Sequence, residues 1–192
     1  MKEKQVKGES TMAKVKVATD WLAGCAGCHM SLLDIDERIV KLLELVEITS
    51  SPVTDLKHPP KEGVTVGILE GAICNTHNIE VAKQMRERCQ ILIAVGDCAT
   101  FGGVPAMRNL CGTEEALKRA YLDTETVVGG LIPDSPELGK PLEMVTGVGE
   151  VVKVDLFIPG CPPRADAFWY ALTELLAGRV PIVLPRELFT YD

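Results

Sequence analysis

The chain has 192 residues, a length typical of one domain with its own hydrophobic core. Its 20 Lys and Arg residues stand against 27 Asp and Glu, and the resulting net charge of -7 argues against nucleic acid as a ligand. The longest apolar runs, such as Ile91–Val95, are far shorter than the ~18 residues of a membrane span, so we expect no such span.

The N-terminal residues 1–12 are polar and charged, and we predict a flexible segment there. They show neither the apolar stretch of a secretory leader nor an Arg pair, so we expect a cytoplasmic protein. Residues 13–192 are predicted to form a single domain. Seven cysteines in a cytoplasmic chain argue for metal or redox chemistry rather than for a disulfide framework.

From residue 13 onward, strand-like and helix-like segments alternate along the chain. Strands are predicted at Ala13–Trp21, Gly63–Gly71, Gln90–Cys98 and Val151–Cys161. Helices are predicted at Ser31–Glu47, Asn75–Cys89 and Arg164–Gly178. The Gly- and Pro-rich stretch Ala99–Glu150 is predicted to be a functional loop or an interface. This order predicts an α/β fold, a mostly parallel sheet with helices on both faces, whose sites form beyond the carboxyl ends of the strands.

Five of the seven cysteines follow predicted strands and therefore fall at one edge of the sheet. Cys25 and Cys28 follow the first strand, Cys74 the second, Cys98 the third and Cys161 the fourth. The remaining two, at positions 89 and 111, are expected to be small buried or half-buried side chains.

The segments AGCAGC, GDCATFGG and PGCPPR surround their cysteines with Gly, Ala or Pro, which lets backbone approach a bulky group. The helix after Cys28 is expected to lower the pKa of the thiols at its start. Four interpretations compete: a thioredoxin-like dithiol, a zinc site, an iron–sulfur cluster and unrelated core cysteines. One CxxC with two distant single cysteines is unlike the paired knuckles of structural zinc, and a cubane cluster, which takes four thiolates from different loops, fits better.

Taken in order, WLxxCxGC, EGAI, GDCATFGG and PGCPP resemble the small subunit of [NiFe]-hydrogenases, over about Val15 to Ala177. The resemblance implies a flavodoxin-like domain on which Cys25, Cys28, Cys98 and Cys161 ligate one proximal [4Fe-4S] cluster. It also implies a partner large subunit that holds the Ni–Fe centre, so that this chain has no catalytic residues of its own and conducts electrons.

The absence of any cysteine after Cys161 makes the chain most similar to the small subunit of cytoplasmic, bidirectional NAD-reducing hydrogenases. In those enzymes the electrons pass to a diaphorase module with iron–sulfur proteins, FMN and NAD. The alternatives are another cytoplasmic hydrogenase and the related subunit of a complex I-like quinone oxidoreductase, although that subunit carries adjacent cysteines in place of the CxxC. FMN is not expected in this chain, because CAGC occupies the place of a phosphate loop.

Six further positions are candidates for a supporting role around the cluster. The resemblance implies that several hydrogenases carry a carboxylate and a Thr, implicated in proton exit, where this chain has Gly24 and Ala26. His29 is either a donor to a cluster sulfide or a surface residue. Glu70 and Asp97 either bind loop amides or relay protons beside the cluster, or are solvated. Cys74 is either a bystander or a substitute thiol.

Overall fold

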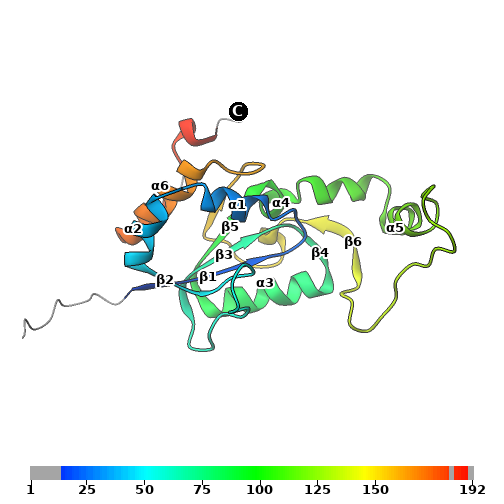
Figure 1. Ribbon diagram of the computed structural model, residues 1–192, viewed down its shortest axis with the longest axis horizontal. Helices are drawn as coiled ribbons and strands as arrows, with labels where there is room; N and C mark the ends of the chain where they lie inside the picture. Colours follow the sequence, from blue (N-terminus) through cyan, green and yellow to red (C-terminus); the bar gives the residue numbers. More distant parts are fainter. Residues whose placement is uncertain (1–13, 182–183, 190–192) are drawn as a thin grey trace, which may run out of the picture.

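The computed structural model describes residues 14–181 and 184–189, so the segment predicted to be flexible, 1–12, lies outside the described residues. One five-stranded sheet has the order β2-β1-β3-β5-β7, and every neighbouring pair is parallel (Figure 1). Its strands are β1 (Val15–Trp21), β2 (Val46–Ser50), β3 (Val64–Glu70), β5 (Cys89–Val95) and β7 (Leu156–Ile158). All carboxyl ends therefore meet at one edge of the sheet.

Helices cover both faces of this sheet, which confirms the predicted fold class. One face packs against α1 (Gly27–Leu33), α2 (Arg38–Leu45) and α6 (Ala165–Leu176), and the other against α3 (Thr76–Arg88) (Figure 1). Phe168 and Ile35 are buried in the first core beside Ile68, whereas Met85 and Leu92 are buried in the second. Successive side chains along each strand point to opposite faces of the sheet, so each strand contributes residues to both cores.

The single helix predicted at Ser31–Glu47 is wrong, because the structure breaks this segment into α1, α2 and the unpredicted edge strand β2. Asp36 adopts a left-handed conformation, with φ of 57°, in the turn between the two helices. The apolar residues keep helical spacing across that turn, which conceals the break. Val46 and Ile48 are β-branched and suit the short strand that follows.

The third strand ends three residues earlier than predicted, and the fourth is much shorter. β5 stops at Val95, and Gly96, with φ of +83°, turns the chain directly into α4 (Gly96–Phe101). A positive φ favours glycine, which explains how so sharp a turn forms here. Cys98 consequently lies in the first turn of a helix instead of in the strand. The segment before β7 forms the short 3-10 helix η2 (Val148–Glu150) and a turn.

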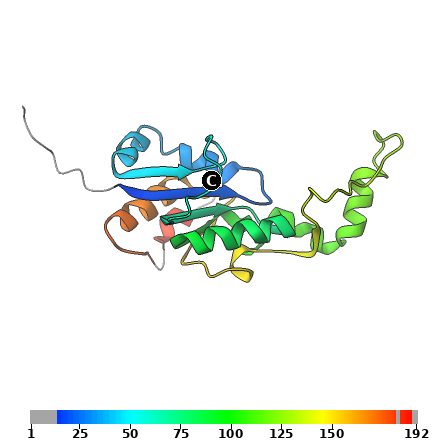
Figure 2. The ribbon, with the colours of Figure 1, turned by 90° about the horizontal axis from the view of Figure 1, so that it is seen from below.

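The stretch Ala99–Glu150 contains more regular structure than predicted. It holds η1 (Val104–Leu110), α5 (Thr113–Tyr121) and β6 (Pro141–Thr146), which pairs antiparallel with β4 (Ile73–Asn75). Residues 104–140, here called the arm, project away from the sheet (Figure 2). Near the other end of the chain, η3 (Arg186–Phe189) follows α6.

A network of hydrogen bonds connects α3, β5 and the residue that precedes β7. Arg86 lies 2.5 Å from Asp155 and donates to the carbonyls of Cys89 and Gln90, while the Leu92 amide donates to Asp155. Burial raises the pKa of the Asp155 carboxyl, but the hydrogen bonds from Leu92 and Arg86 outweigh it, so the net effect is a lowered pKa. None of the helices in the described part of the chain is long and apolar enough to cross a membrane.

Candidate functional site

Four cysteines from three loops surround one cavity at the carboxyl edge of the sheet. Cys25 and Cys28 come from the turn after β1 and the start of α1, Cys98 from α4, and Cys161 from the turn after β7. The cavity, here called the cysteine pocket, has a volume of about 80 Å³. Its other lining residues are glycines, two carboxylates and a proline: Gly24, Gly27, Gly71, Gly160, Glu70, Asp97 and Pro162. The predicted meeting of these four cysteines is therefore confirmed, whereas their role as ligands remains a prediction.

Small residues are required here because backbone and sulfur atoms approach closely. A Cβ atom on Gly96 would overlap the Cys28 sulfur, and one on Gly27 would lie 3.2 Å from the Cys25 sulfur. Cys25 and Cys161 are exposed, and Cys28 and Cys98 are half-buried. Such a donor set fits a cluster, which takes four thiolates and needs backbone close to its sulfurs.

The thiols influence one another electrostatically. Burial raises the pKa of the Cys28 thiol, and the Glu70 carboxylate and the other three cysteines raise it further. Burial also raises the pKa of Cys98, an effect that the Val104 amide opposes and that Cys161 and Cys25 increase. The net shift of the Cys28 pKa is upward, because burial and the neighbouring groups outweigh any lowering by the helix start. Four thiolates in one pocket repel each other, so their deprotonated forms require a cationic group between them.

The side chains around the pocket do not form a site for a single metal ion in the described residues. Within residues 14–181 and 184–189, no three His, Cys, Asp or Glu side chains lie close enough together to hold a single metal ion. Thiolates around one zinc ion stand only ~2.3 Å from the metal. The four cysteines line one cavity, and their ligation of a multi-atom cluster stays a prediction.

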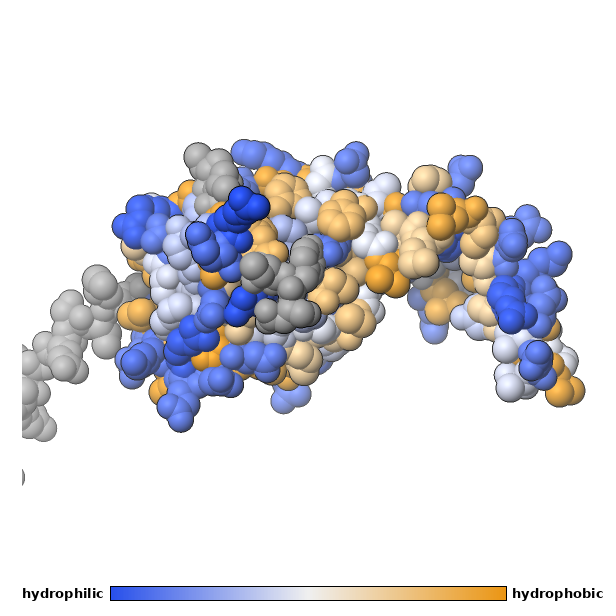
Figure 3. Space-filling view, turned by 90° about the horizontal axis from the view of Figure 1, so that it is seen from above, coloured by the Kyte–Doolittle hydropathy of each residue, from blue (hydrophilic) through white to orange (hydrophobic). Residues whose placement is uncertain are grey.

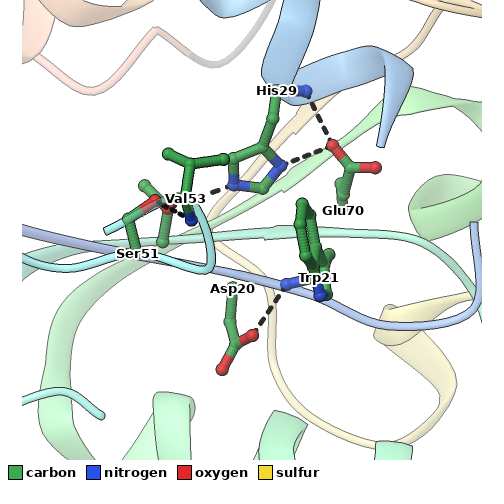
Figure 4. A network of polar contacts seen from close by, with 7 residues as sticks. Asp20, Trp21, His29, Ser51, Val53 and Glu70 are labelled. Atoms are coloured by element: carbon green, nitrogen blue, oxygen red, sulfur yellow. Dashed lines mark hydrogen bonds and ion pairs between the residues drawn. The ribbon is translucent and has the colours of Figure 1, made fainter. Parts of the chain in front are cut away.

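Glu70, at the end of β3, holds the helix that carries Cys28. Its Oε2 accepts a hydrogen bond from the His29 amide at 2.7 Å and lies 2.5 Å from the His29 ring Nδ1 (Figure 4). Glu70 is only 2% exposed and His29 5%. Glu70 binds a backbone amide, but this amide belongs to the first turn of α1 and not to a loop as predicted, and the alternative of a solvated Glu70 is wrong.

The structure places His29 differently from both sequence interpretations. The residue is buried, and its ring lies between Glu70 on one side and Thr19, 3.1 Å from Nε2, on the other (Figure 4). Thr19 in turn donates to Ser51 at 2.9 Å, and the edge of the Trp21 ring meets the His29 ring with centroids 5.7 Å apart. The imidazole therefore joins the pocket to the protein interior and has no nitrogen left for a cluster sulfide.

Two further contacts fasten the Cys161 loop. Asp97 accepts a hydrogen bond from the Gly160 amide at 2.7 Å, and the Asp97 amide donates to the Gly160 carbonyl at 2.9 Å. Ser31, in α1, donates to the Pro163 carbonyl. Every cysteine-bearing loop is thus tied to another segment by hydrogen bonds of the protein itself.

The remaining candidate residues lie at different distances from the cysteine pocket. Gly24 lines the cysteine pocket, and a Cβ atom there would lie 3.7 Å from Glu70 Oε1. Ala26 precedes α1 with a left-handed φ of 63°, a conformation that would strain a β-branched residue. Cys74 does not line the cysteine pocket. Its sulfur instead accepts a contact from the Arg108 guanidinium at 3.8 Å. Cys111 is exposed, contrary to prediction, whereas Cys89 is buried as predicted.

A model of the family described as "NADH ubiquinone oxidoreductase, 20 Kd subunit" matches residues 25–175, a segment that begins at the first cysteine of the pocket and contains the other three. The chain belongs to this family.

Hydrogenase subunits of the family share much of the sequence. The chain is 45% identical to the "NAD-reducing hydrogenase HoxS subunit delta" of Cupriavidus necator, over 93% of this chain and 86% of the relative. It is 40% identical to a subunit of the F420-non-reducing hydrogenase of Methanothermobacter thermautotrophicus, over 90% of this chain but only 56% of that longer relative. The resemblance to NAD-reducing hydrogenase small subunits is confirmed.

Solved structures agree with the flavodoxin-like fold. One chain of an "NAD+-reducing [NiFe]-hydrogenase in the H2-reduced state" superposes with a TM-score of 0.88 at 42% identity, covering 94% of this chain and all of the other. A [NiFeSe] hydrogenase of Desulfovibrio vulgaris Hildenborough reaches a TM-score of 0.56 at 19% identity, over 88% of this chain and 62% of the other, and shows the shared fold alone.

Sequence reasoning missed the supporting residues Thr19, Ser31 and Ser51 in this family member. Their contacts join positions 10, 32 and 132 residues apart in the chain. The residues themselves are common polar types without a motif. No local pattern indicates such contacts, because they depend on the pairing of strands and on how α1 lies over the sheet.

Proposed function

We propose that this chain is the electron-transfer small subunit of a cytoplasmic NAD-reducing [NiFe]-hydrogenase. The observation that carries the proposal is the cysteine pocket, with four thiols from three loops, in a chain 45% identical to such a subunit over 93% of its length. In this role Cys25, Cys28, Cys98 and Cys161 ligate one [4Fe-4S] cluster. When bound, the cluster accepts one electron at a time and passes it on.

The residues around the thiols position and shield this electron site. Glu70 and Asp97 fix the loops that carry the cysteines, so the four sulfurs are held in place by the protein. The glycines keep side chains out of the pocket and bring backbone amides close to it.

The hydrogenase large subunit, with its Ni–Fe centre, is proposed to cover the pocket and the start of the arm. Directly after Cys98, the chain exposes the large apolar side chains of Phe101, Val104, Met107 and Leu110. Apolar side chains gather on the upper side of the molecule toward the arm (Figure 3). An exposed apolar surface beside an electron site is typical of a protein interface. Electrons would leave toward a diaphorase module with iron–sulfur proteins, FMN and NAD.

Anaerobic purification of the complex with metal analysis tests the proposal. We expect four iron atoms and four acid-labile sulfides for this chain, and nickel in its large partner. Cys161→Ser should remove the cluster and H2-driven NAD reduction while leaving diaphorase activity with an artificial donor. The exposed Cys111→Ser is the matched control and should retain both activities. Zinc in place of iron, or H2-driven NAD reduction that survives Cys161→Ser, would contradict the assignment.

A second candidate function is the corresponding subunit of a quinone-reducing complex. The description of the matching family, named after an NADH ubiquinone oxidoreductase subunit, favours it. Nickel in the partner and reduction by H2 support the hydrogenase, whereas a nickel-free partner with NADH-driven quinone reduction would support the alternative.

A further inference from the structure

The chain folds back over Cys98 immediately after helix α4. The Gly102 amide ends this helix by donating to the Cys98 carbonyl at 2.9 Å, and Gly102 has a φ of +99°. Gly103 follows with a φ of +48°, and a Cβ atom there would lie 2.8 Å from the Cys98 nitrogen. Glycine alone combines such backbone angles with so close an approach. Two successive glycines therefore bring the next residue, Val104, back to Cys98.

The Val104 amide donates to the Cys98 sulfur. Val104 is the first residue of η1, and the first residue of a helix has no earlier turn of that helix to which it can donate. Its N–H is instead hydrogen-bonded to Cys98 and favours the thiolate, although burial has the larger and opposite effect on the pKa of this thiol. The turn through Gly102 and Gly103 thus places one backbone donor on a sulfur of the cysteine pocket.

Other amides beside the cysteine pocket donate to oxygen atoms. The His29 amide donates to the Glu70 carboxylate. The Gly160 amide donates to the Asp97 carboxylate, and the Asp97 amide donates to the Gly160 carbonyl. Those hydrogen bonds fasten the loops that carry cysteines. The Val104 amide differs from them because its acceptor is itself one of the four cysteines, so its effect falls on the electron site.

We propose that the Val104 amide raises the reduction potential of the cluster by donating a hydrogen bond to its ligand Cys98. Uptake of one electron from the Ni–Fe centre of the partner adds one negative charge to the cluster and its thiolates. A fixed N–H donor stabilises the more negative state more strongly, so it favours uptake of the electron. The proposal rests on the proposed function, because it requires Cys98 to be a cluster ligand.

The side chain and the amide of Val104 can be altered separately. The side chain is 64% exposed, whereas the amide is turned toward Cys98. Val104→Pro removes the N–H and keeps an apolar side chain, at a first helical position that tolerates proline. Val104→Ala is the matched control, because it keeps the N–H and removes most of the side chain.

Redox titration followed by EPR, in the anaerobically purified hydrogenase complex, measures the midpoint potential of the cluster. The signal of this chain is identified as the one that Cys161→Ser removes, and iron analysis shows that each variant retains its cluster. We expect Val104→Pro to lower the ratio of reduced to oxidised cluster at a fixed potential about ten-fold, which corresponds to ~59 mV for one electron. Val104→Ala should keep the midpoint of the unaltered complex.

An unchanged midpoint in Val104→Pro with full iron content would overturn the proposal. Equal lowering in both variants would also overturn it, because the effect would then belong to the side chain. A second measurement does not depend on the proline variant. With valine labelled by ¹⁵N, pulsed EPR of the reduced complex should show a ¹⁵N coupling to this cluster that is absent from Val104→Ala grown in the same way.

Identical ¹⁵N spectra for these two complexes would overturn the proposal, whether or not Val104→Pro binds iron. Failure of the proposed function is distinguishable from these outcomes. In that case the unaltered complex would show no cluster signal that depends on Cys161.

Discussion

Replacement of Glu70 by alanine should destabilise the chain strongly, even though this residue carries no cysteine. Glu70 Oε2 accepts from the His29 amide at 2.7 Å and lies 2.5 Å from the His29 ring, and both residues are almost fully buried. In Glu70→Ala the buried imidazole and the amide of His29 both lose their protein partner. Breaking a buried pair in this way costs about 3–5 kcal/mol.

That cost is a large part of the ~5–15 kcal/mol by which domains are stable. With a slope of about 2 kcal/mol per molar urea, the midpoint of unfolding should fall by roughly 2 M. Glu70→Gln keeps a carbonyl acceptor of similar shape for the His29 amide and should cost only about 1–2 kcal/mol. Glu47→Ala, an exposed glutamate on β2, is the control and should stay within about 0.5 kcal/mol of the unaltered chain.

Urea unfolding followed by circular dichroism measures these differences in the free energy of unfolding. Iron analysis of the same samples shows whether the cysteine pocket still binds iron. The refuting result would be a Glu70→Ala chain that loses less than about 1 kcal/mol, or equal losses for the alanine and glutamine variants. Either would show that the hydrogen bonds to His29 do not fasten α1.

Three further predictions concern other contacts. Asp97→Ala should lower iron content, because the amide preceding the fourth cysteine loses its acceptor, and Asp97→Asn should restore most of it. Asp155→Asn should cost about 1–3 kcal/mol at pH 7. Because the pKa of Asp155 is lowered in the folded chain, its contribution to stability is present above the unfolded pKa of ~3.9 and disappears as the pH falls through the folded pKa. The free energies of unfolding of the unaltered chain and of Asp155→Asn, measured against pH, should therefore converge at the acid end. Gly96→Ala should lose the cluster, whereas Gly178→Ala, with a similar positive φ but open space, should show only backbone strain in thermal melts.

The fold and the meeting of the cysteines were predictable because both follow from chain order. Alternating strands and helices require a parallel sheet, and a parallel sheet brings the ends of all its strands to one edge. Cys25, Cys98 and Cys161 each follow a different strand, so their approach needed no knowledge of side-chain packing. The motifs that carry the resemblance imply the cluster type, which the geometry alone does not specify and which stays a prediction.

The break after α1 and the surroundings of His29 were not predictable for a physical reason. Asp36 turns the chain through a left-handed conformation while Ile35 and Ile39 keep their helical spacing, so the periodicity of the apolar residues hides the turn. The partners of His29 are Glu70, 41 residues away on β3, which pairs with β1, and Thr19 on β1, which meets His29 because α1 lies over that strand. Local sequence patterns contain neither fact.

Helix α1, which carries Cys28, is fastened at two places. Glu70 holds the first turn of this helix from the end of β3, and Ser31 holds its middle against the Cys161 loop. A helix fastened at both places holds Cys28 at a fixed position beside the pocket. A mobile helix would change the distance between the electron site and its acceptor each time it moved, and electron transfer depends steeply on that distance. The buried contact between the Glu70 carboxylate and the His29 imidazole, although costly to bury, is thus explained by its role in fastening α1.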